Sequence, residues 1–185
     1  MLETGESLSR KKARAIANFI RGLLGINELY VDVPRMLENM TREFPDFNYE
    51  IVEDEELPES VYGTFIPNYE TNQSVVKIPN RVYLAACNNG STSGRDRMTI
   101  VHEIAHYFLI IYFKFKPIEK LGRGRPSKSK DPEWQAMAVA GEILMPFEET
   151  VHMIDPYELA KKCGVSYDAA SYRINKYAKT EKKKP

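Results

Sequence analysis

The chain has 185 residues, of which 43% are hydrophobic and 11% aromatic. This length and composition predict one packed globular domain and exclude a disordered chain. The 26 Lys and Arg residues balance 26 Asp and Glu residues, which excludes a large net charge that would attract the whole protein to nucleic acid or a membrane surface. Cys87 and Cys163 form no C-x-x-C pair, so we expect no disulfide. Without a signal-peptide pattern or a bilayer-length apolar stretch, we expect a soluble, cytoplasmic protein.

The first half of the chain predicts two helices and then short strands. Apolar residues recur at helical spacing between Ser7 and Gly25, and Asp32 with Pro34 predicts a second helix that runs to about Met40. Segments rich in β-branched and aromatic residues predict the strands that follow. These segments are 48–52, 61–66 and 74–78, with a hairpin turn at 68–72 and a further short piece at 81–86.

The second half is predominantly helical in its pattern. A long helix is predicted from about Ser93 to Phe115, then a loop over 116–130 and a helix that begins at Asp131-Pro132 and ends at Pro146. Two shorter helices are predicted at 156–162 and 167–177. We therefore expect a single domain over 1–178, with a C-terminal helical subregion at about 150–178 and a basic flexible tail at 179–185.

The long helix contains the pattern H-E-x-x-H at His102, Glu103 and His106. A spacing of four residues places both imidazoles on one face, where they can bind one Zn²⁺ ion. Glu103 is turned about 100° from His102, so it can approach a water at the metal without being a ligand. The alternative is a pair of hydrogen-bonded histidines that match a short pattern. Because burying such groups without partners is costly, we favour the metal site.

A catalytic zinc ion takes three protein ligands and leaves one position for water. Glu133 lies on the inward side of the next long helix, whereas Glu142 points the opposite way. A carboxylate on an apolar face needs a cation, which a metal supplies. The alternative is that Glu133 is favoured in the first turn by the helix dipole. We favour Glu133 as the third ligand of one zinc ion per chain.

These motifs resemble the ImmA/IrrE-like metallopeptidases. The resemblance is carried by GRDRMTIVHEIAH at 94–106 and EWQAMAVAGEILMP at 133–146, with weaker similarity at 61–87 and 158–177. It extends over about residues 10–178. The chain departs from the family pattern at positions that are not proposed ligands: Met98, Ala105 and Val139.

The resemblance implies an α+β, zincin-like fold, in which a small antiparallel sheet packs beside the active-site helix, with N- and C-terminal helices. It implies zinc ligands at His102, His106 and Glu133. Glu103 would be the general base that takes a proton from the attacking water and delivers it to the leaving amine. The implied activity is that of an intracellular zinc endopeptidase that cleaves a helix-turn-helix repressor of a mobile element or stress response.

A second donor to the developing oxyanion is expected, and His152, Tyr107 and Arg173 are candidates. Each has an ordinary alternative, respectively as a surface residue, a packing residue and a member of an ion pair.

Two other segments raise the question of nucleic-acid binding. The basic stretch GRGRPSKSK has no aromatic residues between its charges, which favours a solvated loop near the mouth of the site. The segment ELAKKCGVSYDAASYRINKY has helix-turn-helix spacing, but its moderate basic charge favours packing and substrate recognition over DNA contact. The rival hypothesis is a non-catalytic DNA-binding or protein-docking module with a structural zinc site. Glu103 favours the enzyme, because a structural site needs no base.

Overall fold

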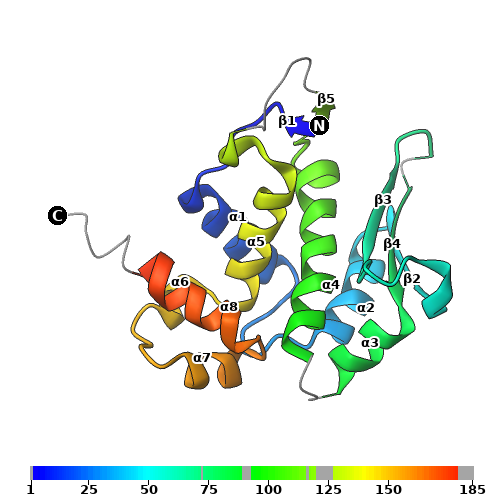
Figure 1. The fold of residues 1–185 in the computed structure, drawn as a ribbon. Coiled ribbons are helices and arrows are strands. Elements are labelled where there is room, and N and C mark those ends of the chain that lie inside the picture. Colours follow the sequence, from blue (N-terminus) through cyan, green and yellow to red (C-terminus); the bar gives the residue numbers. More distant parts are fainter. Residues whose placement is uncertain (1, 72, 89–92, 116, 120–126, 179–185) are drawn as a thin grey trace.

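A computed structural model describes residues 2–71, 73–88, 93–115, 117–119 and 127–178. Helix α4 (Ser93–Tyr107) runs through the middle of the molecule, with a small sheet on one side and helices α1 (Arg10–Leu23) and α5 (Pro132–Leu144) on the other (Figure 1). This arrangement confirms the α+β architecture expected of a zincin-like protein. One hydrophobic cluster includes residues from Leu8 to Ala170, so the core is continuous across these elements.

The N-terminal helices begin where the sequence predicts, because side chains cap their first turns. The Ser9 hydroxyl accepts a hydrogen bond from the N–H of Lys12, 3.2 Å away, at the start of α1. Helix α2 (Val33–Glu43) follows Asp32, whose carboxylate accepts from the N–H of Arg35 at 3.0 Å. Both predicted helices are confirmed.

The sheet has three strands among the described residues. They are β2 (Phe47–Val52), β3 (Thr64–Asn68) and β4 (Gln73–Pro79), in the order β2-β4-β3. Strands β3 and β4 form an antiparallel hairpin, but β2 pairs with β4 in parallel, with Tyr49 opposite Val76. The sheet is therefore mixed, and the prediction of an antiparallel sheet is wrong for β2. The reason is that residues 53–63 carry the chain to the far edge before β4 enters between the two strands. Residue 72 of the predicted hairpin turn lies outside the described residues.

Two further elements differ from the predicted ones. The piece at 81–86, which follows the predicted strands, belongs to a helix, α3 (Asn80–Cys87), because the ladder ends at Pro79 and buried Val82 and Ala86 lie one helical turn apart. Within the predicted loop, β5 (Pro117–Glu119) pairs antiparallel with β1 (Leu2–Thr4). Residues 116 and 120–126 of that loop lie outside the described part of the chain.

Helix α4 is almost entirely enclosed, and its C-terminal end changes geometry. Beyond Tyr107 it continues as a π-helical segment, Phe108–Tyr112, and Lys114 adopts a positive φ of 61° where the helical path ends. Insertions of this kind are frequent at functional sites in helices. The predicted helix to about Phe115 is thus confirmed in extent, with a change of hydrogen-bonding pattern in its last turn.

The start of α4 is fixed by contacts that explain the GRDR part of its motif. A Cβ atom at Gly94 would lie 2.3 Å from the backbone nitrogen of Ser166, so only glycine allows this approach. Arg97 is 1% exposed, and its guanidinium donates to the carbonyl of Gly164 at 2.8 Å and to that of Val31 at 2.5 Å. These residues therefore attach α4 to both an N-terminal and a C-terminal segment.

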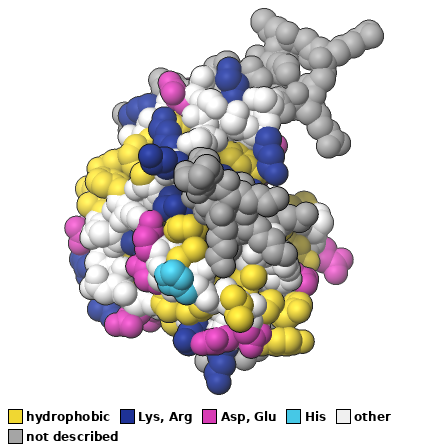
Figure 2. All heavy atoms as spheres, turned by 90° about the vertical axis from the view of Figure 1, so that its left-hand side faces the viewer, with side chains coloured by type: hydrophobic (Ala, Val, Ile, Leu, Met, Phe, Trp, Pro, Cys, Tyr) yellow, Lys and Arg dark blue, Asp and Glu magenta, His cyan; other side chains and the backbone are white. Residues whose placement is uncertain are grey.

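The C-terminal region forms short helices whose buried residues belong to the common core. They are α6 (Phe147–Thr150), α7 (Pro156–Cys163) and α8 (Tyr167–Tyr172), the last continuing as a π-helical segment, Arg173–Ala178. Helix α6 was not predicted, whereas α7 and α8 match the predicted pair. On the face that includes these helices, hydrophobic side chains lie among charges of both signs (Figure 2). The predicted tail at 179–185 lies outside the described residues.

Within the described ranges, no helix combines the length and the apolar character needed to cross a membrane.

Candidate metal centre

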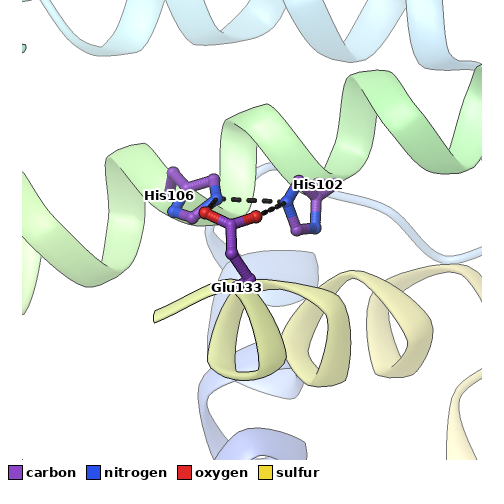
Figure 3. A group of neighbouring side chains, drawn as sticks. All are labelled: His102, His106 and Glu133. Carbon is purple, nitrogen blue, oxygen red and sulfur yellow. Dashed lines mark hydrogen bonds and ion pairs between the residues drawn. The ribbon is translucent and has the colours of Figure 1, made fainter. Parts of the chain in front are cut away.

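Three predicted side chains converge between α4 and α5 (Figure 3). His102 and His106 project from α4 one turn apart, and Glu133 faces them from the first turn of α5. The Nε2 atoms of the two histidines are 3.1 Å apart, and the Glu133 carboxylate lies 3.1 Å from Nε2 of His102 and 3.4 Å from Nε2 of His106. The ligand atoms of all three residues lie within 4.8 Å of one another.

These distances fit a single zinc ion. Ligand atoms at about 2.0–2.1 Å from a tetrahedral zinc lie roughly 3.3–3.4 Å from one another. The three observed separations of 3.1, 3.1 and 3.4 Å are close to that spacing. Two imidazole nitrogens and one carboxylate oxygen are also a donor set that zinc prefers. The three residues therefore form a suitable cradle for the ion, with the ligand number typical of a catalytic site.

The centre is buried on the histidine side and open on the Glu133 side. Both histidines are buried, whereas the Glu133 side chain is 72% exposed. The Asp131 carboxylate caps α5 by accepting from the N–H of Glu133 at 3.0 Å, which fixes this first turn. Hydrogen bonds from His102 and then from His106 hold the pKa of the Glu133 carboxyl well below its ordinary value. Glu133 is thus poised as an anion next to solvent.

Glu103 lies beside this cradle without belonging to it. Its carboxyl is buried, and burial raises its pKa, although the nearby His102 and His106 oppose the increase. The backbone N–H of Phe65 in β3 also donates to this carboxylate. Strand β3 therefore positions the candidate base.

Gly63, just before β3, leaves the space that Glu103 occupies. A Cβ atom at Gly63 would lie 3.1 Å from Cγ of Glu103 and 3.3 Å from Cγ2 of Thr99. Sequence reasoning missed this residue. The only available signal was a glycine inside the predicted strand 61–66, which indicates close approach to a neighbouring group without identifying that group.

A cleft with a volume of about 540 Å³ runs beside the three converging residues. Its described walls come from β3, α4 and the beginning of α5, and they include Glu103, His106 and Glu133. Phe65 and Ile110 add apolar surface, and the Phe65 ring is parallel to that of His106, with centroids 6.4 Å apart. Among the described strands β3 is an edge strand, so the cleft combines an apolar wall with one edge of the sheet.

The structure does not bring the three predicted oxyanion donors to this cleft. The Tyr107 hydroxyl donates to the Asp46 carboxylate at 2.6 Å, and burial together with that bond raises the pKa of Tyr107. Arg173 forms a two-pronged ion pair with Glu142, and His152 is exposed after α6. None of the three is among the described residues that line the cleft. The ordinary alternatives proposed for them describe their positions better.

Comparison with known proteins agrees with the geometry. The Peptidase M78 family model, described as an IrrE N-terminal-like domain, matches residues 71–175. This range contains α4 and α5 but begins after β3, which nevertheless forms a wall of the cleft. No curated protein matches the chain. Because the matched range covers more than half of its length, the chain belongs to the IrrE N-terminal-like family, whose activity is of the metallopeptidase type.

Proposed function

We propose that this protein is a zinc-dependent endopeptidase that cleaves a helix-turn-helix repressor of a mobile element or stress response. The observation that carries the proposal is the convergence of His102, His106 and Glu133 beside a cleft that Glu103 also lines. The repressor class follows from the family resemblance of the motifs at 94–106 and 133–146.

In this proposal His102, His106 and Glu133 hold the ion, and Glu103 performs the proton transfers. A bound zinc ion supplies a Lewis acid, which polarises a peptide carbonyl and makes a water more acidic. Glu103 takes a proton from the attacking water and delivers it to the amine that leaves. The Phe65 N–H keeps the Glu103 carboxylate in place during both transfers. Burial raises the pKa of this carboxyl, which makes it a better proton acceptor than an exposed glutamate.

The substrate lies as an extended segment beside β3. Among the described strands β3 pairs only with β4, along one edge. It lines the cleft at Thr64, Phe65 and Pro67, where the Phe65 N–H donates to Glu103. An extended peptide can add to such an edge through main-chain hydrogen bonds. Strand addition requires a locally unfolded substrate segment, so we expect cleavage in a linker of the repressor rather than inside its folded DNA-binding domain.

The geometry argues against a purely structural zinc site. Structural sites are typically closed by four protein ligands. In the part of the chain that the structure describes, three ligand side chains converge, and the carboxylate among them is largely exposed. A buried glutamate beside these ligands has a clear role in hydrolysis and none in a structural site.

The decisive experiment combines metal analysis with a cleavage assay. The zinc-loaded protein is incubated with a purified helix-turn-helix repressor encoded beside its own gene, and products are identified by intact mass. We expect one zinc ion per chain and cleavage at one site. The Glu103→Gln variant should retain zinc but lose roughly 100- to 10,000-fold in rate, because it keeps the side-chain shape and removes the base.

Two outcomes would overturn parts of the proposal. Unchanged cleavage by Glu103→Gln would remove the assigned base. Stoichiometric zinc together with an intact repressor and a shift of duplex DNA in a gel would support the DNA-binding alternative instead.

A further inference from the structure

Gln135, two residues after Glu133 in α5, carries a buried amide group that the proposed mechanism does not use. The residue is 0% exposed, on a helix whose other core residues are mainly apolar. Burying an amide group is costly unless the group forms hydrogen bonds. Its hydrogen-bond partners therefore indicate what this residue holds in place.

The side chain of Gln135 joins two segments that lie outside α5. Its Nε2 atom donates to the carbonyl of Ser129 at 2.8 Å and to the carbonyl of Glu6 at 2.9 Å. The Ser129 carbonyl also accepts from the N–H of Leu8 at 2.8 Å, and Leu8 belongs to the buried core. One amide group thus attaches residues 6–8 and the segment before α5 to the start of this helix.

Residues 2–8 also hold the other described end of the connection between α4 and α5. Strand β1 pairs antiparallel with β5, with Glu3 opposite Ile118, at the end of the molecule where the α4 path ends (Figure 1). Residues 2–8 therefore contact both described ends of the chain that links the two ligand-bearing helices. The family match begins at residue 71, so it does not include this segment.

Glu133 needs such support because most of its side chain is in solvent. The side chain is 72% exposed and faces His102 and His106 from the first turn of α5. The Asp131 cap fixes the N–H of Glu133, and the N–H of Gln135 donates to the Asp131 carbonyl at 2.9 Å. The backbone of this turn, rather than side-chain packing, therefore sets the position of the carboxylate relative to the histidines.

We infer that Gln135 is a positioning residue of the metal centre. By binding the Ser129 and Glu6 carbonyls, it keeps the first turn of α5 where Glu133 can bind the same ion as the two histidines of α4. A ligand that is held in place before the ion binds loses less freedom on binding, so the affinity is higher. The inference rests on the zinc site of the proposed function and does not depend on peptide cleavage.

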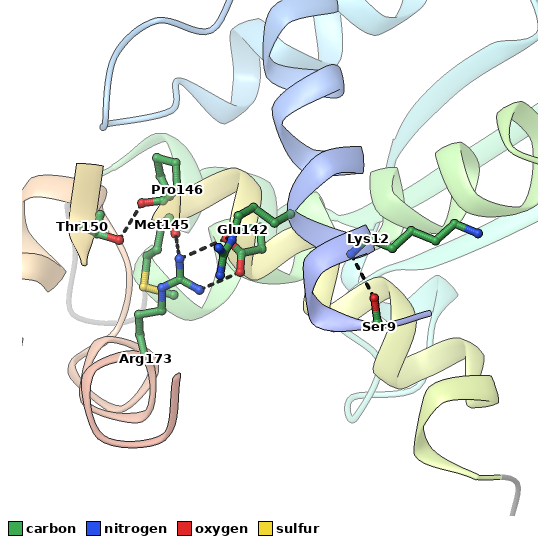
Figure 4. A network of polar contacts seen from close by, with 8 residues as sticks. Ser9, Lys12, Glu142, Met145, Pro146, Thr150 and Arg173 are labelled. Atoms are coloured by element: carbon green, nitrogen blue, oxygen red, sulfur yellow. Dashed lines mark hydrogen bonds and ion pairs between the residues drawn. The ribbon is translucent and has the colours of Figure 1, made fainter. Parts of the chain in front are cut away.

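The test compares two variants that each remove a buried side-chain donor to a backbone carbonyl. Gln135→Met keeps the length of the side chain and removes the amide group. Thr150→Val is the matched control at the other end of α5, because it keeps the shape and removes the hydroxyl that donates to the Pro146 carbonyl at 2.6 Å (Figure 4). Zinc affinity is measured by competition with a chromophoric chelator. We expect the zinc Kd to rise roughly tenfold in Gln135→Met, as for residues that support a metal ligand, and to stay unchanged in Thr150→Val.

A second measurement follows the turn itself in the metal-free protein. The N–H groups of Glu133 and Gln135 both donate to Asp131, so their hydrogen exchange reports local opening of this turn. We expect both amides to exchange faster in Gln135→Met than in the unchanged protein. Thr150→Val should leave their exchange unchanged, because it acts on α6.

Two variants of Asp131 act on the same turn without changing the core, so they decide the matter even if Gln135→Met does not fold. Asp131→Ala removes both the cap and its charge. Asp131→Asn removes the charge and keeps a side chain that caps equally well. We expect the zinc Kd of Asp131→Ala to exceed that of Asp131→Asn by roughly threefold or more, because only the first variant loosens the turn.

Either of two results would overturn the inference and leave the zinc site in place. One is an unchanged zinc Kd in Gln135→Met, and the other is an equal zinc Kd for Asp131→Ala and Asp131→Asn. Failure of the unchanged protein to bind zinc would overturn the proposed function together with this role, and so differs from a failure of the inference alone.

Discussion

Two glutamates on α5 show how one helix serves two purposes. Glu133, in the first turn, is 72% exposed and faces two histidines, whereas Glu142, near the other end, is 2% exposed and faces two arginines. Arg173 binds the Glu142 carboxylate with two hydrogen bonds, and Nε of Arg14 lies 3.9 Å from it. Glu142, near the C-terminal end of α5, is therefore neutralised inside the protein, whereas Glu133, at the N-terminal end, lies beside solvent.

This difference in burial and partners makes Glu133 available for metal binding, whereas Glu142 stabilises the fold. A buried carboxylate is tolerated only when it is paired, and removing one partner leaves an uncompensated charge. A carboxylate next to two imidazoles has strong ligand character and little structural role. The two glutamates should therefore respond in opposite ways to the same substitution.

The largest effect is expected from Glu133→Ala. Loss of one of three ligands should lower zinc affinity by more than the roughly 10- to 100-fold typical of residues that only support a ligand, and cleavage should be abolished. In the metal-free protein, loss of the hydrogen bonds from His102 and His106 should lower the free energy of unfolding by less than the loss expected below for Glu142→Ala, because the Glu133 side chain is 72% exposed. Zinc titration and urea unfolding measure the two quantities, with exposed Glu148→Ala as the control. Full zinc binding by Glu133→Ala would remove this residue from the site.

Glu142→Ala should show the opposite pattern. We expect a loss of about 3–5 kcal/mol in the free energy of unfolding, because Arg173 keeps a buried charge without its partner. Zinc stoichiometry of the folded fraction should be unchanged. The matched control is Glu158→Ala, which removes an exposed pair with Lys162 at 2.7 Å and should cost less than about 1 kcal/mol. Equal losses in urea unfolding for the two variants would contradict the assigned difference in burial.

A smaller effect is expected from Gly63→Ala, which tests the space around Glu103. The added methyl group would lie 3.1 Å from Cγ of Glu103, so the base must shift by a few tenths of an ångström. We expect roughly 10- to 100-fold slower cleavage, equivalent to about 1.4–2.7 kcal/mol in the barrier, with zinc binding intact. Gly22→Ala is the control, since a methyl group fits there. Normal cleavage rates for Gly63→Ala would show that the base tolerates the shift.

The smallest effect is expected for the two cysteines, whose thiols differ in burial and therefore in reactivity. Burial raises the pKa of the Cys163 thiol to about 11, although Arg21 and other nearby arginines oppose the increase, whereas Cys87 is exposed. At pH 8 only about one Cys163 thiol in a thousand is ionised, and the thiolate is the reactive form. We expect a thiol reagent to label Cys87 alone in the folded protein and both residues in urea, as measured by peptide mapping. Rapid labelling of Cys163 in the folded state would contradict its burial.

Local features of the fold could be predicted from the sequence. The caps at Asp32 and Asp131, each with a proline one or two positions later, predict where α2 and α5 begin, because these signals act within one turn. The spacing of four likewise predicts that His102 and His106 share one face of α4, since helical geometry relates residues a few positions apart. Glu133 was favoured for its place on the inward side of α5, and the structure brings it to the two histidines.

Non-local features could not be predicted in the same way. The parallel pairing of β2 with β4 depends on the path of residues 53–63, which no local pattern describes. The approach of Gly63 to Glu103 joins residues that are far apart in the sequence. Arg173 was selected as an oxyanion donor for its chemical type, but its position is decided by Glu142, a partner 31 residues away.

The attachment of Arg97 has a consequence for the order in which the protein is completed during translation. Its two acceptor carbonyls lie 66 and 67 residues away in opposite directions along the chain. The ribosome releases both histidines of α4 well before it adds Gly164, so the nascent helix initially lacks one of the two carbonyls that anchor it. The candidate metal centre therefore gains its final rigidity late in synthesis, when the turn between α7 and α8 has emerged.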